Sequence, residues 1–326
     1  MKRLIDDLVA VSTLSSNRHY LTELRATSVE NGTSVAVAAH DTAALFEWLA
    51  DALSYQGVSD AIAERYIDEH GYVTFGELAH ALEATPSCPR LTSYWHFAEC
   101  RFAKTAYTCS EPEHLRCCPV PKHDLRNGRL NQTAYALFFF LREVCDGDLV
   151  AWIDTRLATA DRPDQPDRAA LMREALLEPL GCIHGVSNKV LSMAMASLLL
   201  GADPRRERWV ITGASMVAVD TLVHNWLHRT GCLRRRSAEH AYGPNCYRPG
   251  GCASIIEEAA RHIDARQFCP EGPAFFPRLV QKAIWRFCAE AHLAVCNGNR
   301  INDRDRCAQT DCPLFEACER VPLRPQ

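Results

Sequence analysis

Most long segments of this chain repeat their apolar residues at the three- and four-residue intervals of an α-helix, and strand-like alternation is nearly absent. Residues 42–56 place Leu45, Leu49 and Leu53 on one face, after an Asp41 that suits a helix N-cap. Further helices are expected over 58–69, 74–84, 131–144, 168–180 and 277–295. The pattern predicts an all-α fold.

Local signals mark where some of these helices begin and end. Gly71 follows 58–69, as glycine commonly does at a helix C-terminus, and Thr74 with Glu77 forms a capping-box pattern. The periodicity fails over 86–129 and again over 231–251. We expect the first stretch to be an insert with its own packing and the second to be irregular.

Length and polarity limit the classes of protein to which the chain can belong. With 326 residues, 47% of them hydrophobic, it can bury a substantial core, and two domains or lobes are expected. The longest apolar stretches, 190–201 and 134–141, are shorter than the roughly 20 residues of a membrane-spanning helix. Asp6 and Asp7 interrupt the apolar start, so we predict an amphipathic N-terminal helix, no membrane span and a cytoplasmic protein.

A formal charge of −4 argues against a protein that coats nucleic acid with a basic surface. Local arginine clusters nevertheless occur at 205–208, 234–236 and 300–306. A solvated loop is the ordinary interpretation of each cluster, and contact with phosphate is the alternative if a nucleic-acid motif lies nearby.

Sixteen cysteines without a secretory signal indicate metal binding or thiol chemistry, because cytosolic thiols are kept reduced. Intervals of 10, 4 and 5 residues separate the last four cysteines, in a loop rich in Asn, Asp and Arg. These four are Cys296, Cys307, Cys312 and Cys318. Such a set suits an iron-sulfur cluster or a structural zinc ion, and spacing alone does not choose between them.

The two irregular regions contain further cysteines. Region 86–129 includes Cys88, Cys100, Cys109, Cys117 and Cys118, and the second region contributes Cys232 and Cys246, with Cys252 directly after it. Neither region contains a CxxC pair with matching partner spacing, so buried thiols are the favoured interpretation and a second metal ion is the alternative. His224 and His228, one helical turn apart, have a spacing compatible with metal, although polar surface positions on the helix are the favoured interpretation.

Two residues at expected helix starts carry possible chemistry. The turn Gly185, Val186, Ser187, Asn188 leads into Lys189, and backbone N–H groups at such a helix start can hold a phosphate. Asp220 precedes the next candidate helix start. Taken singly, Lys189 could be a phosphate contact and Asp220 an N-cap; together, an amine and a carboxylate could break a glycosidic bond.

In this order, the segments resemble the endonuclease III branch of the helix-hairpin-helix DNA glycosylases, over most of residues 41–318. Residues 53–60, with Gln56, look like the family's early Leu-Ser-x-Gln-x-x-Asp segment, displaced by one position at the Asp. The turn at 185–189 is similar to the family's hairpin with its catalytic lysine, and 218–221 matches the segment that carries the essential aspartate. The final cysteines occupy the place of the family's [4Fe-4S] loop.

The resemblance implies two helical lobes. Residues 55–231 would form a six-helix barrel with the helix-hairpin-helix and a Cys-rich insert at about 86–129. Residues 1–54 with 232–326 would form a terminal helical domain with the iron-sulfur loop at 296–318. Cys296, Cys307, Cys312 and Cys318 would hold the cluster, with structural zinc as the alternative.

The implied activity is DNA base excision with associated AP-lyase activity. A modified, mismatched or abasic nucleotide in double-stranded DNA would rotate out of the duplex into a pocket between the lobes. Lys189 would attack the anomeric carbon and form a Schiff base, while Asp220 stabilises positive charge on the sugar. Gln56 would enter the space left by the base, with a surface amide as the alternative, and the residues at 185–188 would contact the DNA backbone. A monomer associated with the nucleoid is expected.

Three differences from the family pattern indicate a divergent subfamily with its own base specificity. Ser187 stands where the hairpin usually has a second glycine, Lys189 and Asp220 are 31 positions apart, and the cysteine intervals are wider than in the family's compact loop. A catalytically silent relative that recognises duplex or damaged DNA is the alternative function.

Overall fold

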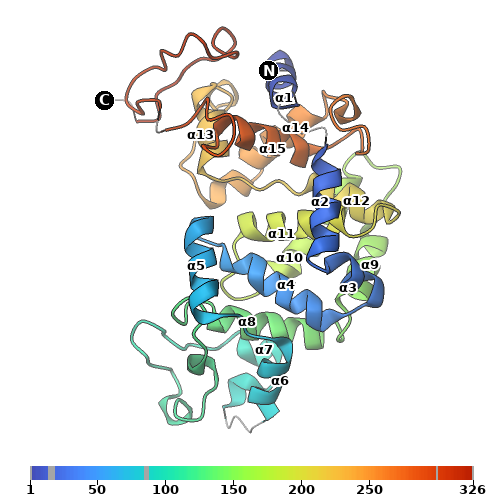
Figure 1. The fold of residues 1–326 in the computed structure, drawn as a ribbon, viewed down its shortest axis with the longest axis vertical. Coiled ribbons are helices and arrows are strands. Elements are labelled where there is room, and N and C mark those ends of the chain that lie inside the picture. The colour runs from blue at the N-terminus through green and yellow to red at the C-terminus, as the bar shows by residue number, and fades with distance from the viewer. Residues whose placement is uncertain (1, 14–18, 84–87, 299, 325–326) are drawn as a thin grey trace. The chain divides into compact units, whose positions relative to one another are not determined.

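The computed structural model of the chain describes residues 2–13, 19–83, 88–298 and 300–324. In these residues the regular elements are helices, with no strand and one isolated antiparallel bridge between Ala103 and Thr108 (Figure 1). The all-α prediction is confirmed. The chain forms two compact units, 28–194 and a second made of 1–27 with 195–326. These units divide the chain at other positions than the expected domains, which stay a prediction.

The unit 28–194 is assembled around one fully buried helix. Every residue of α8 (Asn131–Phe139) is buried, and it packs against α4, α6 and α7. Residues 134–139 of this helix are apolar on every side, a pattern typical of a helix inside the fold, so α8 forms the centre of this unit. The α-helices of the unit are α3 (Thr33–Ala39), α4 (Thr42–Ser54), α5 (Asp60–His70), α6 (Phe75–Glu83), α7 (Tyr94–Phe97), α8, α9 (Leu149–Ala160) and α10 (Arg168–Leu180).

The capping predictions in this unit are confirmed. The Asp41 carboxylate accepts from Ala44 N at 3.0 Å at the start of α4. Thr74 and Glu77 form the reciprocal box of α6, with Glu77 N donating to Thr74 Oγ1 at 3.1 Å and Thr74 N to Glu77 Oε2 at 2.8 Å. Helix 131–144 ends as a π-helix, η5 (Phe140–Val144).

The second unit forms around α15 (Pro277–Cys288), which packs against α1, α12, α13 and α14 (Figure 1). α1 (Lys2–Thr13) is amphipathic, as predicted, and buries Leu4, Ile5, Leu8 and Val9. The remaining helices here are α12 (Glu207–Ser215), α13 (Thr221–Arg229), η6 (Arg234–Arg236), η7 (Pro244–Tyr247), α14 (Cys252–Ala260) and η8 (Ala265–Gln267). α2 (Tyr20–Glu30) and α11 (Asn188–Gly201) contain the two points where the chain passes from one unit to the other.

The helix predicted over 277–295 is shorter in the structure. Ala289 leaves the helical conformation, with a ψ of 136°. The chain then folds back on α15, where Leu293 N donates to Arg286 O at 3.1 Å and Val295 N to Phe287 O at 2.9 Å. These bonds satisfy carbonyl groups at the helix end and direct residues 296–318 away as a loop.

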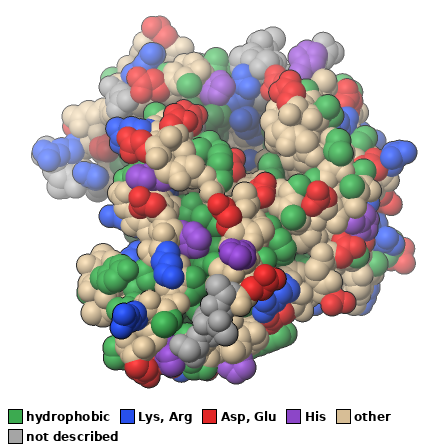
Figure 2. Space-filling model, turned by 60° about the horizontal axis from the view of Figure 1, so that its bottom comes forward, with side chains coloured by type: hydrophobic (Ala, Val, Ile, Leu, Met, Phe, Trp, Pro, Cys, Tyr) green, Lys and Arg blue, Asp and Glu red, His purple; other side chains and the backbone are tan. Residues whose placement is uncertain are grey.

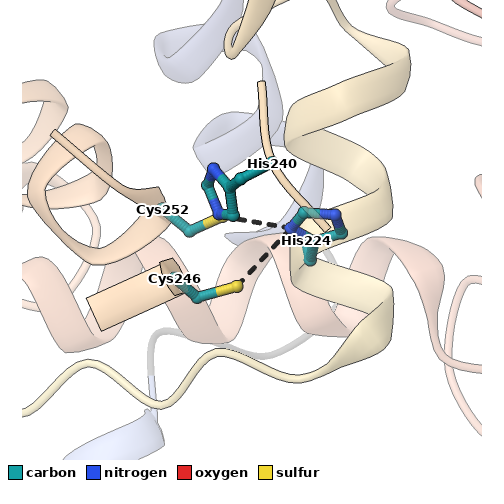
Figure 3. Close-up of side chains that lie close together, drawn as sticks. All are labelled: His224, His240, Cys246 and Cys252. Atoms are coloured by element: carbon teal, nitrogen blue, oxygen red, sulfur yellow. Dashed lines mark hydrogen bonds between the residues drawn. The ribbon is translucent and has the colours of Figure 1, made fainter. Parts of the chain in front are cut away.

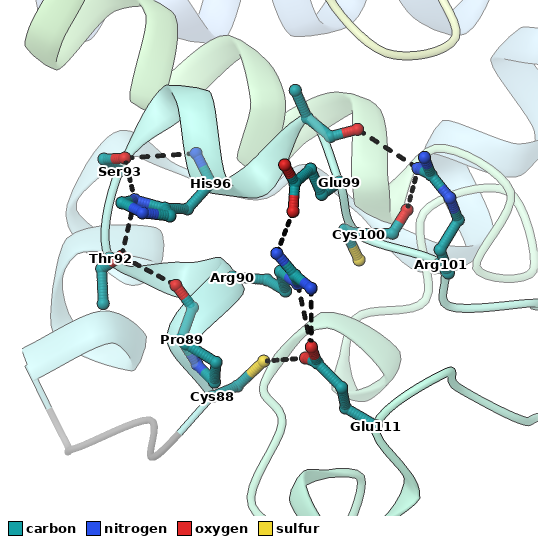
Figure 4. A network of polar contacts seen from close by, with 11 residues as sticks. Cys88, Pro89, Arg90, Thr92, Ser93, His96, Glu99, Cys100, Arg101 and Glu111 are labelled. Carbon is teal, nitrogen blue, oxygen red and sulfur yellow. Dashed lines mark hydrogen bonds and ion pairs between the residues drawn. The ribbon is translucent and has the colours of Figure 1, made fainter.

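The insert is irregular, as expected, and only its part from residue 88 onward is described. Its short helices are η2 (Pro89–Leu91), α7, η3 (Pro112–His114) and η4 (Val120–Lys122). The Arg90 guanidinium pairs with Glu99 and, at 2.9 Å, with Glu111, while Ser93 caps α7 (Figure 4). Charged pairs and caps therefore hold together a segment that has little apolar periodicity.

On the face drawn in Figure 2, acidic and basic side chains are intermingled with hydrophobic ones. This mixture agrees with the small formal charge of −4, and the face that is drawn shows no broad surface of a single charge. Among the described residues, we find no helix with the length and apolar character needed to cross a bilayer.

Candidate metal centres and catalytic residues

The predicted hairpin lies between α10 and α11. Gly185 has a φ of +78°, and a Cβ at this position would lie 2.6 Å from Thr133 Oγ1, so both backbone conformation and packing require glycine. Lys189 follows in the first turn of α11, where it is half-buried. The local sequence thus produces a tight connection with an amine at the start of a helix.

Gln56 contacts this hairpin directly, although 131 positions separate it from Ser187. Its Oε1 accepts from Ser187 N at 3.0 Å, and its Nε2 donates to Gly185 O. Buried Arg126 donates to Gln56 O at 2.6 Å and to Ser54 O at 3.0 Å, which satisfies carbonyl groups after the end of α4. Gln56 therefore holds the hairpin through two side-chain hydrogen bonds, and its contact with DNA stays a prediction.

Asp220 is the N-cap of α13. Its Oδ1 accepts from Val223 N at 2.9 Å, and its backbone is extended, with φ −107° and ψ −175°. The carboxylate is thereby fixed at the positive end of a helix dipole. Lys189 belongs to the unit 28–194 and Asp220 to the other unit, so the structure brings Gln56 to the hairpin but divides the proposed catalytic pair between two units.

The four C-terminal cysteines line one small apolar cavity of about 30 Å³. Trp226 and Arg229 of α13 also line this cavity, as does Thr230, the residue directly after the helix. Cys296, Cys307, Cys312 and Cys318 are all half-buried. Four cysteines separated by 10, 4 and 5 residues in the sequence therefore line the same cavity.

Backbone N–H groups point at the cavity sulfurs. Arg320 N lies 3.4 Å from Cys318 Sγ, and Leu314 N bonds to Cys312 in the same two-residue pattern. Burial, with added repulsion from thiolates at Cys296, Cys312 and Cys307, raises the pKa of Cys318 to about 11. Cys296 differs, because a hydrogen bond from Cys288 lowers its pKa. The donor set fits a bound cation or cluster, which would remove the mutual repulsion of these thiolates.

A second cysteine group, unlike the first, also contains histidine. One ligand atom from each of four residues lies within 4.8 Å of all the others (Figure 3). His224 comes from the second turn of α13, His240 from a loop, Cys246 from η7 and Cys252 from the first turn of α14. His224 Nδ1 lies 3.3 Å from Cys252 Sγ and 3.5 Å from Cys246 Sγ, and His240 Nε2 lies 3.5 Å from Cys252 Sγ. These four residues, the His2Cys2 group, could hold a metal ion.

Several features organise the His2Cys2 group. His240 Nδ1 bonds to Ala238 O at 2.7 Å, which fixes the ring and leaves Nε2 as an acceptor toward the thiols. Gly251 is required by the tight turn before α14, because a Cβ there would lie 2.3 Å from Asn245 O. Hydrogen bonds from Cys252 and His224 lower the pKa of Cys246, whereas burial and the bond to Cys246 raise that of Cys252. One thiolate is thus already favoured in the protein.

Cysteines of the insert also have polar neighbours. Cys88 Sγ lies 3.7 Å from Glu111 Oε2 (Figure 4), and Glu111 N lies 3.5 Å from Cys109 Sγ. Burial raises the pKa of Cys118 to about 11, with added repulsion from thiolates at Cys88, Cys100 and Cys109. In the part of the insert that is described, however, no group of three or more side chains is placed to hold a metal ion.

The His2Cys2 group was missed as a set from sequence. The surface position predicted for His224 is wrong, because this side chain is only 5% exposed. Cys246 and Cys252 are buried, as favoured from the sequence, but they lie beside two histidines, and nothing in the local sequence marks His240 as one of them. The equal spacing His240-x5-Cys246-x5-Cys252, within a stretch without helical periodicity, is the signal that could have found the group.

Comparison with protein-family models, with curated proteins and with solved structures finds no match to this chain. Assignment of its function therefore depends on the chain's own residues and their geometry.

Proposed function

We propose that this chain is a DNA glycosylase with AP-lyase activity that acts on a modified, mismatched or abasic nucleotide in duplex DNA. The observation that carries the proposal is the organisation of α13, which begins at Asp220 and ends at the cavity lined by the four C-terminal cysteines. One nine-residue helix thereby connects a fixed carboxylate with a candidate cluster site. The ordered hairpin before Lys189 supplies the second part of the proposed site.

In the proposed reaction, the Lys189 amine attacks the anomeric carbon of the nucleotide while the bond from that carbon to the base breaks. The leaving base takes the electron pair of the glycosidic bond, and Asp220 stabilises the positive charge that develops on the sugar. Opening of the sugar ring gives a Schiff base, and β-elimination then expels the 3′ phosphate. Water finally hydrolyses the Schiff base and restores the lysine.

Cys296, Cys307, Cys312 and Cys318 would hold a [4Fe-4S] cluster, which supplies structural support for the DNA-binding loop rather than a step of the reaction. Among the described residues, the one group of three or more side chains placed to hold a single ion includes none of these four cysteines. A cluster with one cysteine on each iron is therefore the favoured group, and a structural zinc ion is the alternative. Arg300, Arg304 and Arg306 are exposed in the same loop, where they can contact phosphates.

Borohydride trapping on duplex DNA with an abasic site tests the proposal. The wild-type chain should give a covalent protein–DNA adduct, because borohydride reduces a Schiff base to a stable amine. Lys189→Ala should give none, whereas Lys122→Ala, which removes an exposed lysine of the same unit, should retain it. Absence of an adduct with wild type on abasic DNA, or its persistence in Lys189→Ala, would sink the lyase assignment.

A catalytically silent DNA-binding protein is the second candidate, and the placement of Lys189 and Asp220 in different units is the observation that favours it. The hydrogen bond from Ser187 N to Gln56 leaves one N–H group fewer at the hairpin for a phosphate, which applies to both candidates. Specific binding of damaged duplex, without an adduct and without base release, would support this candidate.

A further inference from the structure

We propose that His224, His240, Cys246 and Cys252 bind one Zn²⁺ ion in a closed, structural site. This centre is separate from the cavity of the four C-terminal cysteines, which shares none of its residues. The proposal does not depend on glycosylase activity.

The separations of the ligand atoms agree with a single tetrahedral zinc ion. Zinc lies about 2.0–2.1 Å from imidazole nitrogen and about 2.3 Å from thiolate sulfur, and the tetrahedral angle then places nitrogen and sulfur about 3.5 Å apart. Three of the four nitrogen–sulfur separations in the group are 3.3, 3.5 and 3.5 Å. All separations within the group are at most 4.8 Å, so a small inward movement of the side chains would bring the four donors onto one ion (Figure 3).

The same separations argue against a two-iron cluster with two histidines and two cysteines. In such a cluster the histidines bind one iron and the cysteines the other, so nitrogens and sulfurs lie on opposite sides. In this group, His224 Nδ1 contacts the sulfurs of both Cys246 and Cys252. Intermixed nitrogen and sulfur donors around one point are typical of tetrahedral zinc.

Burial and charge favour the ion as a structural element. Cys246 and Cys252 are 0% exposed, and two thiolates with two neutral imidazoles balance the charge of Zn²⁺. Four protein ligands leave no open position for a substrate or water. The ion would connect the irregular segment 237–252 to α13, one turn after Asp220, where helical periodicity provides no other support.

Metal content of the purified full-length chain tests the site. Cys246→Ser and Cys252→Ser should each lower zinc by one equivalent per chain, measured by mass spectrometry, and leave iron unchanged. Cys232→Ser is the matched control, because Cys232 is equally buried in the same core but lies outside the group. Its zinc content should equal that of wild type.

A variant that exchanges one metal ligand for another keeps the test valid if a serine variant folds poorly. His240→Cys retains four donors and should keep the zinc equivalent, whereas His240→Ala should lose it. With cobalt in place of zinc, wild type should show the visible bands of tetrahedral cobalt, and the bands should shift in His240→Cys because one nitrogen donor becomes sulfur.

Wild-type zinc content that persists in both serine variants would overturn the proposal. Loss of iron rather than zinc from these variants would also overturn it and would assign a cluster to the group. A wild-type chain grown with ample zinc that contains none would have the same force.

Discussion

At the scale of single residues, Gly185 shows how one position determines a functional connection. Its positive φ costs about 1–2 kcal/mol for any L-residue, and the contact with Thr133 adds a clash on top of that cost. The two effects are separable, because Gly147 has a similar φ of +74° and no atom within 4 Å of an added Cβ.

We predict that Gly185→Ala lowers the free energy of unfolding by about 3 kcal/mol and Gly147→Ala by about 1 kcal/mol. Denaturant unfolding measures both. Adding Thr133→Ala should reduce the Gly185→Ala loss toward that of Gly147→Ala, because it removes the hydroxyl that the new Cβ meets. An equal loss of unfolding free energy in Gly185→Ala and Gly147→Ala would contradict this prediction, because it would mean that the Thr133 side chain moves aside at no measurable energetic cost.

Residue-scale prediction succeeded where the signal is local. Asp41, Thr74 and Glu77 act through atoms three positions away, so their roles follow from the adjacent sequence. His224 could not be placed in this way. Its partners are Cys246 and Cys252, 22 and 28 positions onward, and only the folded path of an irregular segment brings them together.

At the scale of one element, α13 connects several parts of the proposed site. Asp220 caps its start, His224 faces the His2Cys2 group, and Arg229 lies at the cysteine cavity. A helix start after Asp220 was expected, because Asp is a common N-cap. The buried position of His224 was not, since a histidine on a helix has the same spacing whether it faces solvent or a thiol.

The two roles of Asp220 can be separated by substitution. We predict that Asp220→Asn leaves the free energy of unfolding within about 0.5 kcal/mol of wild type, because Asn caps as well as Asp and only the charge–dipole contribution is lost. Asp220→Ala should cost about 1 kcal/mol. Base release should fall at least about 100-fold in both variants if the charge stabilises the sugar cation. Near-normal release by Asp220→Asn would show that Asp220 is a cap alone.

α15 contains a lysine that makes stability depend on pH. Burial, with added repulsion from Arg278 and Arg286, lowers the pKa of Lys282 from 10.5 to about 8, and its amine lies 4.3 Å from the Trp285 ring centre. Below pH 8 both states carry the proton, and the folded state bears the full cost of a partly buried charge. Between pH 8 and 10.5 the unfolded state binds more protons, so stability rises with pH from this residue.

We therefore predict that Lys282→Met raises the free energy of unfolding by about 1–3 kcal/mol at pH 7 and that the gain shrinks as the pH approaches 10. Denaturant titrations at several pH values provide the measurement. Lys122→Met, which replaces an exposed lysine of the unit 28–194, is the control for the loss of a lysine charge at the surface. A gain that grows with pH would contradict the assigned direction of the shift.

At the scale of the whole molecule, the chain consists of two compact units that differ in what stabilises them. The unit 28–194 has the buried, aromatic-rich helix α8. The unit made of 1–27 and 195–326 contains the His2Cys2 group and the cavity lined by the four C-terminal cysteines. The sequence predicted an all-α fold and two parts, because helical periodicity and length are visible in it. The resemblance groups residues 28–54 with the terminal domain, whereas their contacts with α6, α8 and α9 lie inside the unit 28–194, and such tertiary contacts are not visible in the sequence.

Metal removal should therefore affect the units unequally. After treatment with a strong chelator, we predict that backbone amides in α13 and α14 exchange with solvent at least about tenfold faster, while those of α8 keep their protection. Hydrogen exchange followed by mass spectrometry resolves these segments. The Cys232→Ser chain, chelated in parallel, should behave as wild type. Equal acceleration in α8 would indicate that both units open as one.

The pairing of α1 with α15 has a consequence for biosynthesis. A ribosome adds about 5–20 residues per second, so roughly 10 to 50 s pass between completion of α1 at Thr13 and the start of α15 at Pro277. During that time Leu4, Ile5, Leu8 and Val9 have no α15 against which to pack. During synthesis the chain thus exposes the apolar face of α1, which a chaperone can bind until α15 has been translated.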